Sequence, residues 1–225
     1  MDERDLSITE ATDMLNMVEV INQMGCIKRF SRDHLLKDEN VLEHVGFVVT
    51  FCAIIAERLT QQGIMVNRGR LLTGAAFHDI EENLTGDVAR PTKYATKAVY
   101  NGLNSYANKS ATHVFKTLGM PIAKEYWAEA KAEGIEGAIL KMADFASVVV
   151  KCLTEIVYYG NRSFVRVLNE MLDSSTAVYQ ELSSKYIELE PYVRGLIDIL
   201  AHIESDLKHN RNTFPINSWI ESFEG

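Results

Sequence analysis

The chain has 225 residues, of which 47% are hydrophobic and 24% charged, and its formal net charge is −8 at pH 7. This length suits one domain with a sizeable core, and the acidic balance argues against a broad nucleic-acid-binding surface. The N-terminal "MDERDLSITE" is unlike a signal peptide, and no apolar run approaches the length that spans a bilayer. Cys26, Cys52 and Cys152 form no CxxC pair. We therefore expect reduced thiols and a cytoplasmic protein.

Apolar residues recur mostly at helical spacing, and only four prolines occur. The first expected helix begins at Thr9 and ends at Gly25, with Met14, Val18 and Ile21 on one face. In chain order, the expected helices run from about Thr9 to Met24, Glu39 to Gln61, Asn67 into "LLTGAAF", Lys93 to Leu118 with an interruption, Ile122 to Glu133, Glu136 to Tyr159, Ser163 to Ser184 and Glu188 to His209. No convincing strand alternation appears, so the sequence predicts an all-α fold.

The stretch "AAFHDIEENLTGD" places His78 and Asp79 directly after an apolar helix. His44 lies beside the apolar stripe of the preceding helix. Asp144, in "AILKMADFASVVV", has apolar residues on almost every side of its helix. A carboxylate in such a place costs several kcal/mol if it stays dry and unpaired, roughly in line with buried charges elsewhere. Asp144 therefore needs compensation, either from Lys141 or Lys151 or from a metal ion.

Two imidazoles and two carboxylates suit Mn²⁺, Co²⁺, Fe²⁺, Zn²⁺ or Mg²⁺ in six-coordinate geometry. Four protein ligands would leave room for one water and one substrate oxygen, and such an ion activates water and neutralises phosphoryl charge. Each residue alone has an ordinary alternative, because a His-Asp doublet is common by chance and a helical histidine often makes only a hydrogen bond. Their joint order favours a metal site.

The order H…HD…D resembles the HD-domain metal-dependent phosphohydrolases, and more narrowly the bacterial 5′-deoxynucleotidases of the YfbR type. The resemblance covers about Ile27 to Phe164 and is carried by "KRF" with "ENVLEH", by "FHDIEENLTGDVARPTKY" and by "KMADFASVVVKCLTEIVYYGNRSF". It implies a compact HD-domain helical bundle forming a single domain over residues 1–225, with a core at about 9–184 and a C-terminal extension at about 185–225. It also implies a homodimer or a higher homo-oligomer.

The resemblance implies a role for each matching residue. The metal ligands would be His44, His78, Asp79 and Asp144; the catalytic acids Glu82 and Asp87; and the substrate-binding residues Arg29, Phe30 and Lys93. Glu82 lies one helical turn after His78, so both side chains are expected on one face. Its alternative is a solvent-facing acid at a helix end, whereas Asp87 could simply stabilise the turn at Gly86. Phe30 falls where these enzymes carry tryptophan, which leaves the selectivity for 2′-deoxy sugars open.

The implied reaction is metal-dependent hydrolysis of the 5′-phosphate of (deoxy)nucleoside monophosphates, with one divalent ion as cofactor. One alternative is a dNTP triphosphohydrolase that releases triphosphate, with Lys28, Arg32, Arg90 and Lys97 supporting the longer phosphate tail. A second alternative is a nucleotide-binding HD protein without catalysis.

Overall fold

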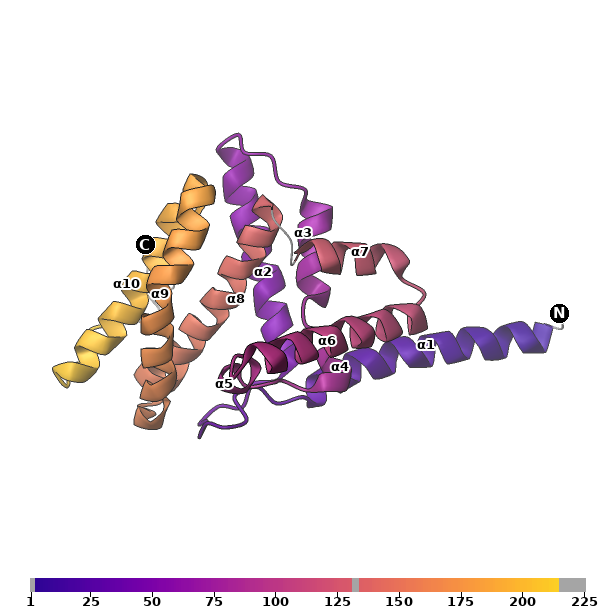
Figure 1. Ribbon diagram of the computed structural model, residues 1–225, viewed down its shortest axis with the longest axis horizontal. Coiled ribbons are helices and arrows are strands. Elements are labelled where there is room, and N and C mark those ends of the chain that lie inside the picture. The colour runs from indigo at the N-terminus through magenta and orange to yellow at the C-terminus, as the bar shows by residue number, and fades with distance from the viewer. Residues whose placement is uncertain (1–2, 131–133, 215–225) are drawn as a thin grey trace, which may run out of the picture. The chain divides into compact units, whose positions relative to one another are not determined.

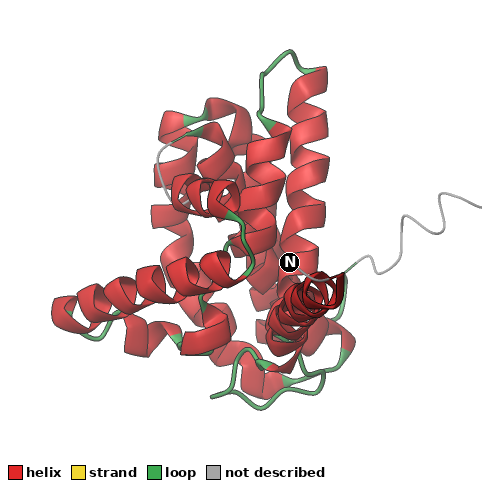
Figure 2. Ribbon diagram, turned by 90° about the vertical axis from the view of Figure 1, so that its right-hand side faces the viewer, coloured by secondary structure: helices red, strands yellow, loops and turns green. Residues whose placement is uncertain are grey.

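A computed structural model describes residues 3–130 and 134–214. All regular secondary structure within these residues is helical, which confirms the predicted fold class (Figures 1 and 2). The elements are α1 (Glu3–Cys26), α2 (Val41–Gln61), α3 (Arg68–Phe77), α4 (Glu82–Thr85), α5 (Arg90–Lys93), α6 (Lys97–Thr117), α7 (Pro121–Ala130), α8 (Ile135–Cys152), η1 (Leu153–Tyr158), η2 (Arg162–Phe164), α9 (Val165–Lys185), η3 (Ile187–Leu189) and α10 (Glu190–Lys208). None of the helices described here is apolar over a length that would cross a membrane.

The described residues form two compact units. The first unit contains the chain up to Asp33 and Lys37–Ser147, and the second contains His34–Leu36 and the chain from Val148 onward. The predicted single domain with a core at about 9–184 stays a prediction. Residues 131–133 of one expected helix, and residues 215–225 of the expected C-terminal extension, lie outside the described residues.

Helix α2 begins where a capping box forms. The side chain of Asn40 accepts a hydrogen bond from the backbone N–H of Glu43 at 2.9 Å, and the Glu43 carboxylate accepts one from the Asn40 N–H at 3.0 Å. Two backbone donors that the helix itself leaves free are thereby satisfied. The stripe predicted along this helix is buried and consists of Val41, Val45, Val48, Cys52, Ile55 and Leu59. Helix α2 packs through it against α3.

Helix α3 ends before the stretch "NLTGD", where the sequence predicts the break of this helix. Asn67 caps its start by accepting a hydrogen bond from the N–H of Arg70 at 3.0 Å, and the last helical residue is Phe77. Residues 78–81 form a turn, and the short helix α4 that follows is capped at its C-terminal end by Gly86, whose φ is +66°. A side chain disfavours this backbone conformation, which explains glycine at that position.

Helix α1 departs from its prediction at both ends. It starts at Glu3 rather than near Thr9, and it continues through Gly25 to Cys26. Its expected apolar face is exposed, since Met14, Val18 and Ile21 are 60%, 54% and 55% accessible. Its last part contributes to the core, where Met24 packs with Val41, Ile80 and other buried residues.

The second unit is built on the long helices α9 and α10, which pack against each other. The long helix predicted before them, with its end near Gly160, is not α-helical over its whole length. It is α-helical to Cys152 and then winds as a π-helix, η1, before Gly160 adopts a φ of +69°. Such wide turns are rare and often occur at functional positions.

Candidate metal centre and active site

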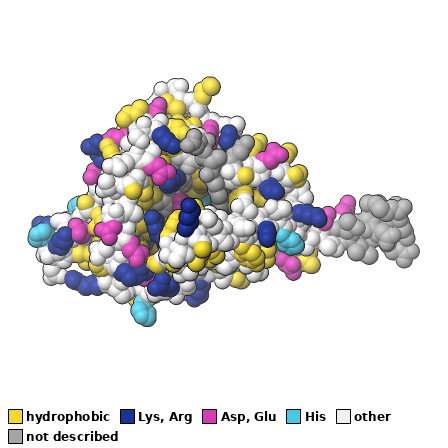
Figure 3. Space-filling model, in the orientation of Figure 1, with side chains coloured by type: hydrophobic (Ala, Val, Ile, Leu, Met, Phe, Trp, Pro, Cys, Tyr) yellow, Lys and Arg dark blue, Asp and Glu magenta, His cyan; other side chains and the backbone are white. Residues whose placement is uncertain are grey.

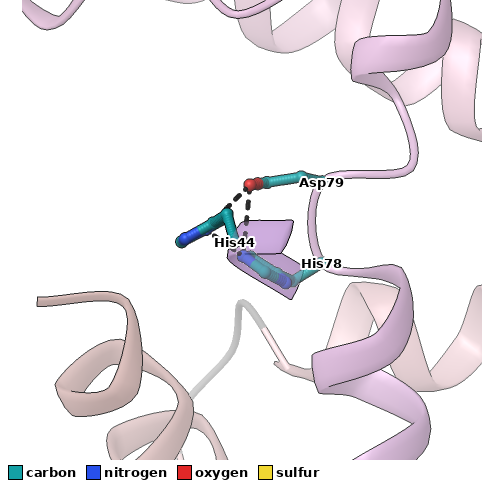
Figure 4. Close-up of side chains that lie close together, drawn as sticks. All are labelled: His44, His78 and Asp79. Carbon is teal, nitrogen blue, oxygen red and sulfur yellow. Dashed lines mark hydrogen bonds and ion pairs between the residues drawn. The ribbon is translucent and has the colours of Figure 1, made fainter. Parts of the chain in front are cut away.

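Two helices of the first unit bring three ligand-type side chains together. His44 lies on the buried face of α2, and His78 and Asp79 lie in the turn after α3. The Nε2 atoms of the two histidines are 3.0 Å apart, and each lies 3.2 Å from Oδ2 of Asp79. Figure 4 shows the three side chains pointing toward one another. Their ligand atoms all lie within 4.8 Å of one another.

The turn fixes how His78 presents its ring. Its Nδ1 lies 2.7 Å from the carbonyl oxygen of Ala75, to which it donates a hydrogen bond. In the neutral ring, the lone pair is then on Nε2, which faces His44 and Asp79. A hydrogen bond to the outer nitrogen is the usual arrangement behind a metal-bound histidine.

The charges of neighbouring groups shift the pKa values of the side chains in this cluster. Burial by itself lowers the pKa of His78, but the carboxylates of Asp79 and Asp144 and the bond to Ala75 raise it to about 9. Burial also opposes ionisation of Asp79, yet the neighbouring imidazoles hold the pKa of its carboxyl well below the ordinary value. The site therefore attracts positive charge.

Asp144, on α8, lies beside this cluster at a solvent-exposed position. Its Oδ1 lies 3.4 Å from Nε2 of His44, and its side chain is 55% exposed. The expectation that apolar neighbours surround Asp144 is therefore wrong, because the apolar positions of α8 leave one face of the helix open. Lys151, one of its two alternative partners, pairs with Glu155 at 2.9 Å.

Glu82 is the first residue of α4 and lies in a low-dielectric, acidic environment. Its Oε2 is buried and has no hydrogen-bond partner among the described residues. Burial, followed by the charges of Asp79 and Asp87, raises the pKa of Glu82 to about 10, although Arg29 opposes the shift. We expected Glu82 and His78 to lie on one helix. This expectation is wrong, because a turn separates α3 from α4. The turn nevertheless leaves Glu82 facing inward.

Arg29 and Phe30 lie in the loop between α1 and α2. The Nη1 atom of Arg29 donates to Oε1 of Glu39 at 2.8 Å, and its guanidinium carbon lies 5.2 Å from the centre of the Phe30 ring. Burial alone would lower the pKa of Arg29, but Asp144, Glu39, Asp79 and Asp87 raise it above the usual value. The guanidinium thus stays charged beside the metal-ligand cluster.

Asp87 is connected to the same loop. Its Oδ2 accepts a hydrogen bond from the backbone N–H of Phe30 at 3.2 Å, and Phe30 has a φ of +55°, which is uncommon for a residue with a side chain. Burial raises the pKa of Asp87 even though Arg29 opposes that shift. Lys93 is half-buried at the end of α5, and its ammonium forms no ion pair with another described residue.

Sequence reasoning missed three residues that support these side chains. Glu39 is the partner of Arg29. Glu81 is buried and accepts a hydrogen bond at 3.0 Å from the indole N–H of Trp127, which also lies 3.2 Å from the carbonyl oxygen of His78. The indole thereby supports the turn that carries the His-Asp doublet. Glu81 adjoins Glu82 in the sequence, but nothing there distinguishes their roles.

The donor set fits a divalent metal ion. Two imidazole nitrogens and a carboxylate oxygen converge, a second carboxylate is adjacent, and one imidazole is held by a backbone carbonyl. Without a cation, two ring nitrogens 3.0 Å apart would have to share a proton or oppose their lone pairs. Mixed nitrogen and oxygen donors suit Zn²⁺, Mn²⁺, Fe²⁺ or Co²⁺.

Comparison with known proteins places this geometry in context. The family model described as "5′-deoxynucleotidase YfbR-like" matches residues 16–188. A 5′-deoxynucleotidase from Yersinia pseudotuberculosis is 28% identical over 180 residues, which cover 74% of this chain and 85% of that protein. A 5′-deoxynucleotidase from Yersinia pestis matches with the same identity and coverage.

Two solved structures share the fold. An HD-domain phosphohydrolase from Listeria innocua superposes with a TM-score of 0.65 and 23% identity, covering 88% of this chain and 99% of that one. The HD phosphohydrolase DatZ of cyanophage S-2L, solved with dA and one catalytic Zn²⁺, gives a TM-score of 0.53 and 16% identity over 83% of this chain and 96% of that one.

Proposed function

Because the chain belongs to the YfbR-like 5′-deoxynucleotidase family, we propose that it hydrolyses the 5′-phosphate of deoxynucleoside monophosphates at the cluster formed by His44, His78 and Asp79. Membership of this family was predicted from the sequence motifs and is confirmed. The observation that supports the site most directly is the convergence of three ligand atoms within 4.8 Å of one another. Asp144 is proposed as the fourth ligand, because its Oδ1 lies 3.4 Å from Nε2 of His44.

A divalent ion held by these four side chains would supply an activated water and offset charge on the phosphoryl oxygens. One structural neighbour supports this cofactor, since the cyanophage enzyme was solved with a catalytic Zn²⁺. The ion in this protein is proposed only as divalent, because the same donors suit several metals.

Arg29 is proposed to bind the substrate phosphate. Its guanidinium is charged, partly buried and positioned by Glu39, and a planar fork of donors matches two phosphate oxygens. Phe30 would pack against the sugar, and Asp87 would hold the backbone of Phe30 in place through its N–H. Lys93 would add positive charge near the phosphate.

Glu82 is proposed to handle the proton of the reaction. In hydrolysis, a water oxygen forms a bond to phosphorus, the bond from phosphorus to the 5′-oxygen breaks, and that oxygen gains a proton. A carboxyl with its pKa raised to about 10 holds a proton at neutral pH and suits the donor in this step. Burial is the largest cause of this raised pKa, and a cation beside Asp79 would offset the part that the charge of Asp79 contributes.

The decisive experiment measures product release from each deoxynucleoside and ribonucleoside mono- and triphosphate, with Mg²⁺, Mn²⁺, Co²⁺ and Zn²⁺ in turn. Orthophosphate from the monophosphates is the expected result. Triphosphate from dATP would favour the triphosphohydrolase instead, and absence of turnover with all substrates would favour a binding protein.

Two site variants and one control variant connect this activity to the site. Asp79→Ala should abolish turnover and metal binding, whereas His113→Ala, an exposed histidine on α6, should leave both unchanged. Arg29→Ala should raise KM about 10- to 100-fold, because it removes a charge-assisted contact to the phosphate. Equal effects of Asp79→Ala and His113→Ala would contradict the proposed site.

We also propose that the protein acts as a homodimer in a reducing compartment such as the cytoplasm. The dimer is supported by the exposed apolar face of α1, where Met14, Leu15, Met17, Val18 and Ile21 are each more than 40% accessible. The compartment is supported by three free cysteines, Cys26, Cys52 and Cys152. Val18→Glu should convert the dimer to a monomer in light scattering, and a monomeric wild type would refute the dimer.

A further inference from the structure

A buried ion pair in the second unit takes no part in the proposed reaction. Nζ of Lys151, in the last turn of α8, lies 2.9 Å from Oε1 of Glu155 in η1, and the two side chains are 3% and 0% exposed. Removing two charges from water costs several kcal/mol per ion, roughly, unless further hydrogen bonds satisfy them. The other hydrogen-bond partners of Glu155 therefore indicate the role of this ion pair.

One of those partners, Leu36, lies more than a hundred residues away in the sequence, and the other, Asn161, follows Glu155 by six residues. Oε2 of Glu155 accepts hydrogen bonds from the backbone N–H of Leu36 at 2.9 Å and from the side-chain amide of Asn161 at 2.7 Å. The same amide nitrogen donates to the carbonyl oxygen of His34 at 2.7 Å. The pair thus fastens the backbone of residues 34–36.

Residues 34–36 are the middle of the loop that carries Arg29 and Phe30. At its base, this loop is closed by two backbone bonds, from the N–H of Arg29 to the Glu39 carbonyl at 2.9 Å and from the N–H of Val41 to the Ile27 carbonyl at 3.0 Å. Leu36 is 64% exposed, so burial of its side chain does not hold the middle of the loop. Backbone hydrogen bonds to Glu155 and Asn161 do.

We propose that Lys151, Glu155 and Asn161 are positioning residues that fasten the loop between α1 and α2, and thereby limit the positions available to Arg29 and Phe30 when the substrate phosphate binds. The proposal rests on the function proposed for Arg29. It follows from connectivity, since Arg29 is only five residues before His34 and a loop fixed at its base and its middle has few conformations. Preorganising a phosphate-binding arginine strengthens binding without adding a contact.

The residue types suit this task. A carboxylate accepts a backbone N–H more strongly than a neutral group does, and Asn161 supplies both a donor for His34 and an acceptor for the N–H of Ser163 at 3.2 Å. Lys151 compensates the charge of Glu155. Glu155 follows Lys151 by four residues and lies in the π-helical η1, and both side chains are buried.

The hydrogen bond from the Leu36 N–H to the Glu155 side chain is called the tether below. Two double variants distinguish the effect of the tether from the effect of the two charges of the ion pair. Lys151→Met with Glu155→Gln removes both charges but keeps a side-chain oxygen for Leu36, whereas Lys151→Met with Glu155→Met removes that acceptor as well. With the full-length metal-loaded protein and dAMP, the Met/Met variant should raise KM about tenfold with kcat within about twofold, which is the signature of lost binding common to ground and transition states. The Met/Gln variant should stay within about threefold of wild type in KM.

Hydrogen exchange provides a readout that does not depend on turnover. The backbone amides of residues 34–36 should exchange much faster in the Met/Met variant than in the Met/Gln variant, while α2 stays protected in both. Equal exchange and equal KM in the two folded variants would overturn the proposal. If the wild type releases no phosphate from any nucleotide, the proposed function fails while the exchange result still decides whether the tether exists.

Single variants give the same answer should the Met/Met protein not fold. Asn161→Ala removes the bond to His34 and should raise KM and exchange at residues 34–36. Arg162→Ala, its neighbour, removes only a bond to Asn210 and should change neither. The same response from both variants, or none from Asn161→Ala, would overturn the proposal.

Discussion

Among individual residues, Glu82 has the environment least compatible with folding. Its carboxyl is buried beside the acids Asp79, Asp87 and Glu81, and its Oε2 has no partner among the described residues. An acid whose pKa is raised on folding destabilises the native state wherever the unfolded chain would ionise it. Such a cost is typical of residues retained for chemistry rather than for stability.

Glu82→Gln should therefore separate activity from stability. Turnover should fall at least about 100-fold, because the amide cannot transfer a proton. The metal-free variant should be more stable than wild type at neutral pH, by roughly 1–3 kcal/mol. The sign follows from the two pKa values: the unfolded carboxyl ionises near the usual 4.5, the folded one near 10, so the penalty grows as pH rises above 4.5.

Urea unfolding of the metal-free proteins at about pH 4 and about pH 7 tests this sign. The two proteins should have similar stability at the lower pH and differ at the higher one. A Gln variant that is less stable than wild type at neutral pH, or one that keeps full turnover, would contradict this role of Glu82.

At the scale of secondary structure, the capping box of α2 lies at the junction of loop and site. Asn40 satisfies the N–H of Glu43, follows Glu39, which pairs with Arg29, and precedes His44 by one helical turn. Asn40→Ala should destabilise the protein by about 1 kcal/mol, the usual cost of losing such a cap. Denaturant titration measures this, with Thr96→Ala, which removes a lone capping bond at α6, as the comparison. A change below about 0.3 kcal/mol would show that the box contributes little.

Helix α10 carries an acid whose contribution depends on pH in the opposite direction from that of Glu82. The backbone N–H of Thr213 lowers the pKa of Asp206 most, burial opposes the shift, and the Thr213 hydroxyl, His202 and Arg211 lower it further. A lowered pKa stabilises the folded state above the unfolded value near 3.8, and this stability is lost as pH falls through the folded value. Asp206→Asn should therefore lower the Tm at neutral pH, and the difference between the two proteins should shrink as pH falls below 3.8 and the carboxyl of the wild type becomes protonated. A constant difference in Tm across this range would exclude ionisation as the cause.

Helices with strong local signals were predictable from the sequence, and long-range contacts were not. The apolar stripe of α2 predicted a helix from about Glu39, within two residues of its observed start at Val41. The exposure of Asp144 was mispredicted, because periodicity on one helix does not reveal which face another element covers. Likewise, the hydrogen bond from Leu36 to Glu155 joins residues 119 apart, and no local pattern encodes it.

At the scale of the whole molecule, the formal net charge is −8 at pH 7. On the face shown in Figure 3, basic side chains are interspersed with acidic ones. Acidic groups are also clustered at the site, where Asp79, Glu82 and Asp87 lie close together and dielectric screening is weak. A divalent cation at this cluster would therefore be a large contribution to the stability of the protein as well as to its chemistry, since ligands that bind only the folded state stabilise it by mass action.

Metal affinity should consequently depend on pH in a way set by His78. In the metal-free protein its pKa is raised to about 9, so at pH 6 to 8, roughly, the ion has to displace a proton from Nε2. Apparent affinity should rise by up to about tenfold per pH unit and level off only above about pH 9, whereas an ordinary histidine would level off above about pH 6.5. Calorimetric titration with Zn²⁺ or Mn²⁺ at three pH values measures this, and chelation at constant pH should lower the Tm. His202→Ala, on the exposed side of α10, should retain the same pH dependence. An affinity that is already constant between pH 7 and 8, roughly, would mean that no histidine of raised pKa binds the ion.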